Sequence, residues 1–283
     1  MESKQPEIII QPSEPGMPAS RWVVIGASVQ GTSHMRVGLP CQDAYAFKVI
    51  NDDILVAAVA DGLGTAASSQ VGSKLAAASV VTCLEQVLTS LTPGEEASWI
   101  KLIQECFITA RDNLEEEAQR SQSDLRSYGT TLVLAVLAPG WLVTGQIGDG
   151  AVVAALDDGR MVLASMPQNE EYVNVTYPLT MPDMLQHAEF KASHIRARAL
   201  ALMTDGMQHV SISSLDKAPH APFFEPLFRQ LSGVKDMQKA SLNLAEFMAS
   251  SAISSRTDDD KTLVLIGQQN GERDNAPMHS QND

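Results

Sequence analysis

The segment ILVAAVADGLG, residues 54–64, joins a run of seven apolar residues to an Asp-Gly pair. A run of this length and composition predicts a buried strand. An aspartate also stands at one end of an apolar run in three other segments, WLVTGQIGDG (141–150), ALALMTDG (199–206) and DDDKTLVLIG (258–267). Four expected strand ends therefore carry the carboxylates of Asp61, Asp149, Asp205 and Asp259.

These carboxylates need a partner, because burying an unpaired charge costs much free energy. Lysine and arginine are scarce around the four positions, so a metal ion is the expected counter-charge. Carboxylate and carbonyl oxygens are hard ligands that suit Mg²⁺ or Mn²⁺. Glycine after an aspartate lets the backbone turn sharply and brings a carbonyl close to an ion. The pattern indicates a metal-dependent enzyme.

Composition narrows the class of protein. The chain has 283 residues, is 44% hydrophobic and carries a net charge of −14, so it can bury a large core but offers no basic stripe for nucleic acid. Its three cysteines form no metal-binding motif and are expected to be reduced thiols. No signal peptide and no membrane span are recognised. We expect a cytoplasmic protein that binds neither nucleic acid nor membrane.

The order of elements predicts the architecture. Residues 1–20 and 268–283 are rich in polar residues and are expected to be flexible tails around one domain, residues 21–267. Expected strands cover 22–28, 43–50, 54–60, 130–138, 141–147, 151–156, 161–165, 197–204 and 262–267, and expected helices cover 68–91, 97–121, 220–232 and 235–254. Tight turns make hairpins and antiparallel pairing dominant. The predicted fold class is α+β, a four-layer α-β-β-α sandwich with two stacked sheets and a helical pair on each outer side.

Six short blocks of sequence carry a family resemblance. In chain order they are Gln42-Asp43, VAAVADGLG, Gly129-Thr130-Thr131, GQIGDGAVV, LMTDG and DDKTLVLI. Together they resemble the metal-dependent type 2C protein phosphatases (the PPM family), which remove phosphate from phosphoserine and phosphothreonine. The segments GTSHMRVGLPCQDA, PHAPFFEPLF and TDDDKTLVLIG are similar to a compact bacterial subgroup, often found beside a Ser/Thr kinase and a von Willebrand A-type protein.

The resemblance implies a role for each aspartate. Asp61 would bridge two Mn²⁺ or Mg²⁺ ions, and the carbonyl of Gly62 would bind one of them. Asp205 and Asp259 would complete the other site, Asp43 would act at the site directly or through water, and Asp149 would help to hold a third ion. The family pattern selects Asp259 because Thr262 follows it at the right spacing. Its neighbours Asp258 and Asp260 are expected to be solvated.

The chain also departs from the family pattern. Leu63 stands where animal members carry a histidine thought to act as general acid, and Gly38 stands where many members bind phosphate with an arginine. Arg36 lies in the same loop and would either clamp the substrate phosphate or form a surface salt bridge. His34 would either transfer a proton or hold the loop through a hydrogen bond.

Competing enzyme classes fit the residues less well. A haloacid dehalogenase-type phosphatase needs a nucleophilic aspartate where Val59 stands, and GQIGDG is followed by a strand-like run rather than the helix of a dinucleotide site.

The predicted function is a Ser/Thr phosphoprotein phosphatase, in which a metal-bridging water attacks phosphorus without a phosphoenzyme. The alternative is a weak or inactive phosphatase fold that binds phosphoproteins in a kinase signalling complex. Residues 166–197 take the place of the family's variable flap, and either shape substrate access or form a plain surface excursion.

Overall fold

Two antiparallel sheets form the centre of the molecule. The computed structural model describes residues 5–11, 21–166, 176–213 and 216–269. One sheet has the order β3-β4-β5-β6-β9 and the other has the order β1-β2-β13-β10-β7-β8. The first contains β3 (Ala44–Ile50), β4 (Ile54–Ala60), β5 (Leu132–Ala138), β6 (Trp141–Ile147) and β9 (Glu189–Ser193). The second contains β1 (Ile8–Ile9), β2 (Trp22–Val29), β7 (Ala151–Leu156), β8 (Met161–Ser165), β10 (Ala197–Met203) and β13 (Lys261–Gln268).

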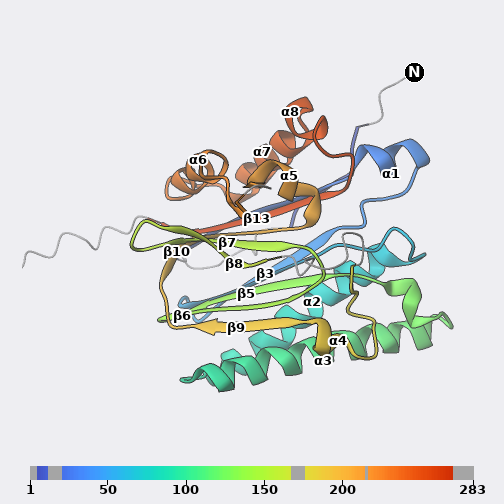
Figure 1. Ribbon diagram of the computed structural model, residues 1–283, viewed down its shortest axis with the longest axis horizontal. Coiled ribbons are helices and arrows are strands. Elements are labelled where there is room, and N and C mark those ends of the chain that lie inside the picture. Colours follow the sequence, from blue (N-terminus) through green and yellow to red (C-terminus); the bar gives the residue numbers. More distant parts are fainter. Residues whose placement is uncertain (1–4, 12–20, 167–175, 214–215, 270–283) are drawn as a thin grey trace, which may run out of the picture.

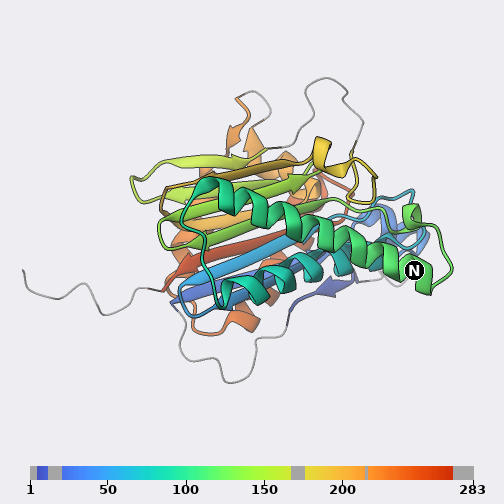
Figure 2. The same ribbon diagram turned by 90° about the horizontal axis from the view of Figure 1, so that it is seen from below.

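Helices cover the outer face of each sheet. The long helices α2 (Ser69–Leu88) and α3 (Glu96–Arg120) lie side by side on the five-stranded sheet (Figure 2). On the other sheet lie α6 (Ala221–Leu231), α7 (Met237–Ala249) and α8 (Ser251–Ser254). Smaller elements are α1 (Thr32–Val37), α4 (Met184–His187), α5 (Gln208–Ser211), β11 (Ile212–Ser213) and β12 (Ala218–Pro219). Figure 1 shows the succession helix, sheet, sheet, helix, which confirms the predicted four-layer α+β sandwich.

The apolar run of β4 is continuous because both of its faces are buried. Leu55, Ala57 and Val59 pack against the other sheet, whereas Val56 and Ala58 pack toward α2 and α3. Successive side chains of a strand point to opposite faces, so a strand in the middle of a sandwich needs apolar residues at every position. The burial of β4 on both faces therefore explains why residues 54–60 form an unbroken apolar run.

The expected pattern did not include several short elements, among them α4, α5, β11 and β12. Ile8–Ile9 pairs antiparallel with β2, although residues 1–20 were expected to be a tail. α1 occupies an expected loop, and β9 forms the edge of the five-stranded sheet within residues 166–197. Residues 167–175 of the expected flap lie outside the described part of the chain. These elements are short and only partly buried, so their apolar pattern is too weak to predict them.

Helix α2 alone among the described helices is long and apolar enough to satisfy the length and composition of a membrane span. Half of its apolar window is buried, and the helix packs against α3, β3 and β4. The core helix of a globular domain meets the same criterion.

Candidate metal centre

Three strand ends bring carboxylates together at one rim of the sandwich. Asp61 follows β4 in one sheet, Asp205 follows β10 in the other, and Asp149 lies in the turn that carries the chain from β6 to β7. One oxygen atom from each of these carboxylates lies within 4.8 Å of the others. The hydroxyl of Thr176 holds Asp149 by donating a 2.7 Å hydrogen bond to its Oδ2. The two sheets thus meet in a triad of oxygen ligands.

Asp43 is buried beside this triad at the start of β3. Its Oδ2 accepts hydrogen bonds from the hydroxyls of Thr204 and Thr262, at 2.7 and 2.8 Å. These threonines lie at the end of β10 and in β13, so Asp43 links the two sheets. Asp259 lies just before β13, and its charge acts on Asp61. The charges of Asp43, Asp149, Asp205 and Asp259 thus all act on Asp61, whereas the described carboxylates that share one 4.8 Å group are Asp61, Asp149 and Asp205, and Asp259 is exposed.

Mutual repulsion in this cluster is visible in the pKa values. Burial is the largest cause that raises the pKa of Asp61 well above its usual range, and the charges of Asp43, Asp205 and two further aspartates add to it. Burial followed by the charges of Asp149 and Asp259 raises the pKa of Asp205 to about 7. Raised pKa values of carboxylates that share a site indicate that too little positive charge lies near them to offset burial and repulsion. A divalent cation would supply it.

Unused acceptor atoms support the same conclusion. Asp43, Asp149 and Asp205 each bury an Oδ1 atom that has no hydrogen-bond partner among the described residues. A buried acceptor without a partner costs free energy, and most such atoms in folded proteins are paired or bind an ion. Because the available donor atoms are oxygens, the residues fit a hard divalent cation rather than zinc or copper.

The Asp61-Gly62 turn is held from both sides. Thr131 Oγ1 accepts a 3.0 Å hydrogen bond from the amide of Asp61, and Thr130 Oγ1 donates a 2.9 Å bond to its carbonyl. A Cβ atom on Gly62 would lie 2.8 Å from the carbonyl oxygens of Gln42 and Ser69. Only glycine fits this position, and the threonines have a structural role at the turn.

Asp260 corrects one expectation from the sequence. It was expected to be a solvated neighbour, but it is 2% exposed. Its carboxylate accepts hydrogen bonds from the amides of Gly31 and Gln42, both at 2.6 Å, and contacts His34 Nδ1 at 2.9 Å. Strand alternation fails here because the chain bends at Asp259 and β13 begins only after Asp260. Asp260 therefore anchors the segments that precede Asp43 and surround α1.

Replacing Asp260 by alanine is expected to destabilise the protein by about 2–4 kcal/mol and to weaken metal binding, because two buried amides lose their acceptor. Asp258→Ala is the matched control, since Asp258 is 68% exposed and surface changes cost about 0.5 kcal/mol or less. Denaturant unfolding and calorimetric titration with Mn²⁺ measure the two effects. Equal stability and equal affinity in both variants would remove the anchoring role.

The α1 loop places both candidate residues, His34 and Arg36, against the segment Asp258–Asp260 that precedes β13. His34 contacts Asp260, and its charge acts on Asp259. Arg36 donates a 2.9 Å bond to Asp258 and one of 3.1 Å to the carbonyl of Thr32, and its side chain is 68% exposed. The geometry thus includes both a loop hydrogen bond for His34 and a surface salt bridge for Arg36.

Lys261 is a neighbour of the site that was not expected from the sequence. Its side chain is buried, and its Nζ donates a 3.0 Å hydrogen bond to the carbonyl of Asp259. Burial lowers its pKa, although Asp260 and Asp43 act in the opposite direction. The sequence feature that could have revealed Lys261 is its position directly before the apolar run TLVLIG. One lysine does not balance five aspartates, so the need for further positive charge remains.

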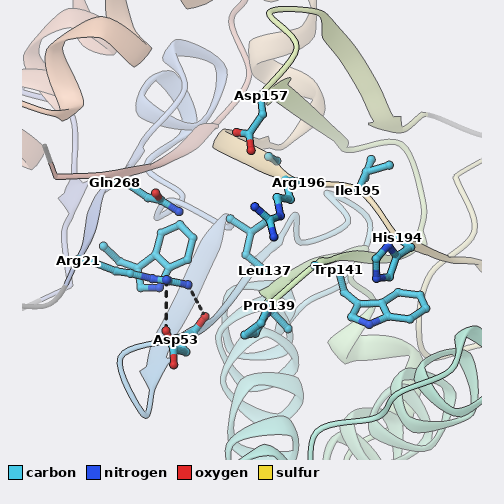
Figure 3. A pocket seen from close by; sticks show the side chains of 14 residues that line it. Arg21, Asp53, Leu137, Pro139, Trp141, Asp157, His194, Ile195, Arg196 and Gln268 are labelled. Carbon is cyan, nitrogen blue, oxygen red and sulfur yellow. Dashed lines mark hydrogen bonds and ion pairs between the residues drawn. The ribbon is translucent and has the colours of Figure 1, made fainter. Parts of the chain in front are cut away.

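A cavity of about 830 Å³ lies elsewhere, at the opposite ends of the strands. It is lined by residues of the β3–β4 turn such as Asp53, whereas Asp61 stands at the other end of β4. Figure 3 shows Arg21 paired with Asp53 on one side of this cavity and Trp141 near His194 on another. Its lining lacks the carboxylate cluster, so we assign the chemistry to the aspartate rim.

The fold and the rim define a class, an α-β-β-α sandwich whose strand ends offer carboxylates to divalent metal ions. The family model described as protein phosphatase 2C matches residues 30–249. Serine/threonine-protein phosphatase 3 of Escherichia coli is 35% identical over 250 residues, which are 86% of this chain and 97% of that protein. The chain belongs to the protein phosphatase 2C family, a family of metal-dependent enzymes, and the predicted resemblance is confirmed.

Solved structures agree with the fold. A serine/threonine phosphatase from Staphylococcus aureus has a TM-score of 0.59 at 13% identity, covering 91% of this chain and 100% of that one. A serine-threonine phosphatase 2C from Toxoplasma gondii has a TM-score of 0.60 at 14% identity, covering 93% and 100%. At these identities the likeness concerns the architecture.

Proposed function

We propose that this chain hydrolyses phosphoserine and phosphothreonine in proteins, using two or three Mn²⁺ or Mg²⁺ ions held by the aspartate rim. The observation that carries the proposal is the meeting of Asp61, Asp149 and Asp205 within 4.8 Å. Bound ions would supply an activated water and neutralise phosphoryl charge. Asp61, Asp205 and Asp259 are the proposed principal ligands, with Asp43, Asp149 and the Gly62 carbonyl completing the set.

The chain's own residues prepare this site in three ways. Thr204 and Thr262 orient Asp43 through its Oδ2, which leaves Oδ1 available. Thr130 and Thr131 hold the backbone of Asp61. Asp260 ties the start of the α1 loop to the segment before Asp43. A set of ligands fixed in advance lowers the cost of placing the ions and the substrate.

The non-catalytic alternative is not favoured, because loss of the metal-site aspartates would mark it and all five are in place. The proposed partners are phosphoproteins, a Ser/Thr kinase that phosphorylates them and a von Willebrand A-type protein. The kinase, the von Willebrand A-type protein and a cytoplasmic location are supported by the resemblance to the bacterial subgroup and by the composition of the chain.

The test is hydrolysis of p-nitrophenyl phosphate and of a phosphothreonine peptide with Mn²⁺, with Mg²⁺ and with EDTA. Turnover is expected with metal, and EDTA and Asp205→Ala should each abolish it. Asp158→Ala is the matched control, because Asp158 also precedes a glycine but lies in an exposed turn paired with Arg160. Folded protein without turnover under any metal would point to the phosphoprotein-binding alternative.

The α1 loop completes the proposal with a phosphate-binding Arg36 and a proton-donating His34. Because Asp260 engages Nδ1 of His34, Nε2 is left to protonate the leaving group. His34→Gln should therefore lower kcat about 10²-fold for the phosphothreonine peptide but little for p-nitrophenyl phosphate, whose leaving group needs no proton.

Arg36→Gln should raise KM about tenfold through loss of a charged hydrogen bond. Arg160→Gln, another exposed arginine in an ion pair, is the control. Equal losses for both substrates would reject the acid role of His34, and an unchanged KM would reject the clamp.

A further inference from the structure

Two of the three cysteines meet where α2 packs on α3. Cys83 lies on α2 and Cys106 on α3, where the 2.9 Å hydrogen bond from Asn113 of α3 to the Ser79 hydroxyl of α2 joins the two helices one turn from Cys83, and each thiol acts on the pKa of the other. Cys106 is fully buried among residues of the helix-sheet core such as Ile103 and Phe107, whereas Cys83 is only partly buried. The pair therefore has one member that a reagent can reach and one that it cannot. Figure 2 shows the two helices running next to each other.

The two thiols have different proton affinities. The interaction with the Cys106 thiol is the largest cause that lowers the pKa of Cys83 to about 7, and Thr109 adds to it, against burial and the charge of Glu105. The same interaction, followed by burial and by the charge of Cys83, raises the pKa of Cys106. The partly exposed thiol is thus the one that loses its proton more readily. Thiolate character together with access is what makes a cysteine reactive.

We propose that Cys83 and Cys106 are a dithiol oxidation site, which low-molecular-weight disulfides convert reversibly into a disulfide bond joining α2 to α3. The sulfur of Cys83 attacks the small disulfide, whose S–S bond breaks and releases one thiol. Cys106 then loses its proton, and its sulfur attacks the Cys83 sulfur of the mixed disulfide, which releases the second thiol. In sum, the protein loses two electrons and two protons, and the small disulfide gains them.

The site is separate from the metal centre. α2 approaches the centre through Ser73, whose hydroxyl donates a 2.5 Å hydrogen bond to the carbonyl of Gln42. Cys83 lies ten residues further along the same helix, about 15 Å away at 1.5 Å per residue. The third cysteine, Cys41, is fully buried, and its Sγ donates a 4.0 Å hydrogen bond to the carbonyl of Asp43. Oxidation of the pair therefore alters no proposed metal ligand.

The test compares the wild type with Cys83→Ser and Cys106→Ala during incubation of the whole chain with oxidised glutathione. Intact mass and peptide mapping under non-reducing conditions are the readouts. The wild type should lose two hydrogen atoms and yield a peptide pair linked through Cys83 and Cys106, and dithiothreitol should reverse the change. Cys106→Ala should instead keep a glutathione adduct on Cys83, since no second thiol is there to displace it. Cys83→Ser should gain neither modification.

Three results would overturn the proposal. They are a stable glutathione adduct on Cys83 of the wild type, a linkage through Cys41, and an unmodified Cys83 after the incubation. Wild-type mapping alone distinguishes these outcomes, so the test holds even where a substituted core cysteine impairs folding. Circular dichroism of each variant verifies that the compared proteins are folded.

Discussion

Asp61→Ala is expected to reduce metal-dependent phosphatase activity about 10³-fold or more. Asp61 lies at the centre of the carboxylate cluster, because its pKa is raised by the charges of Asp43, Asp205, Asp259 and Asp149. Removing a proposed metal ligand would weaken ion binding at the rim, and metal ions provide a large part of the stabilisation of a phosphoryl transition state. The measurement is kcat/KM with p-nitrophenyl phosphate at saturating Mn²⁺.

The stability of the same variant separates loss of function from loss of fold. In metal-free protein, Asp61→Ala removes a half-buried carboxylate that its neighbours repel, so the melting temperature should stay the same or rise. The control Asp158→Ala should keep both activity and stability, because Asp158 is half exposed in a turn. Full activity in Asp61→Ala would mean that the assigned centre is wrong. A collapsed melting temperature would instead assign Asp61 a structural role.

The strands were predictable because both faces of most of them are buried. β4, β5 and β7 consist of buried residues throughout, so each appears in the sequence as an unbroken apolar run. β9 has only one buried residue of five and contains Glu189 and Lys191, as is common for an edge strand. β1 has two residues and owes its position to pairing with β2. Such edge elements depend on tertiary pairing rather than on their own composition.

The candidate site was predictable to the same extent and for a related reason. Asp61 directly follows an apolar run, and Asp149 and Asp205 each follow one after a single residue, so the ends of the runs indicate a common rim. Asp260 was missed because its partners Gly31, Gln42 and His34 come from segments more than 200 residues away. Long-range hydrogen bonds of this kind leave no periodic trace in the sequence. The local rule of strand alternation was wrong here because β13 begins at Lys261, so Asp260 lies before the strand.

Metal should stabilise the protein far more at pH 7.5 than at pH 5. The folded pKa of Asp205 is raised from 3.8 to about 7, and those of Asp61 and Asp43 are raised as well. Between the unfolded and folded values the native state binds more protons than the unfolded state, so the metal-free protein loses stability as pH rises from about 4 to about 7. A pKa that is one pH unit higher in the folded state than in the unfolded state corresponds to about 1.4 kcal/mol. In metal-free protein, the rim therefore destabilises the fold most at the pH where its carboxylates are deprotonated and able to bind an ion.

The ion reverses this balance, because it binds the deprotonated carboxylates and competes with protons at low pH. At about 100 times its dissociation constant, Mn²⁺ adds about 2.7 kcal/mol, or roughly 5–10 °C in melting temperature for a domain of this size. Melting curves with Mn²⁺ and with EDTA at both pH values give the increment directly, and ion pairs elsewhere cancel in the difference. Asp61→Asn should flatten the pH dependence, whereas Asp158→Asn should leave it intact. An equal increment at pH 5 and pH 7.5 would show that these carboxylates are not the groups that the metal titrates.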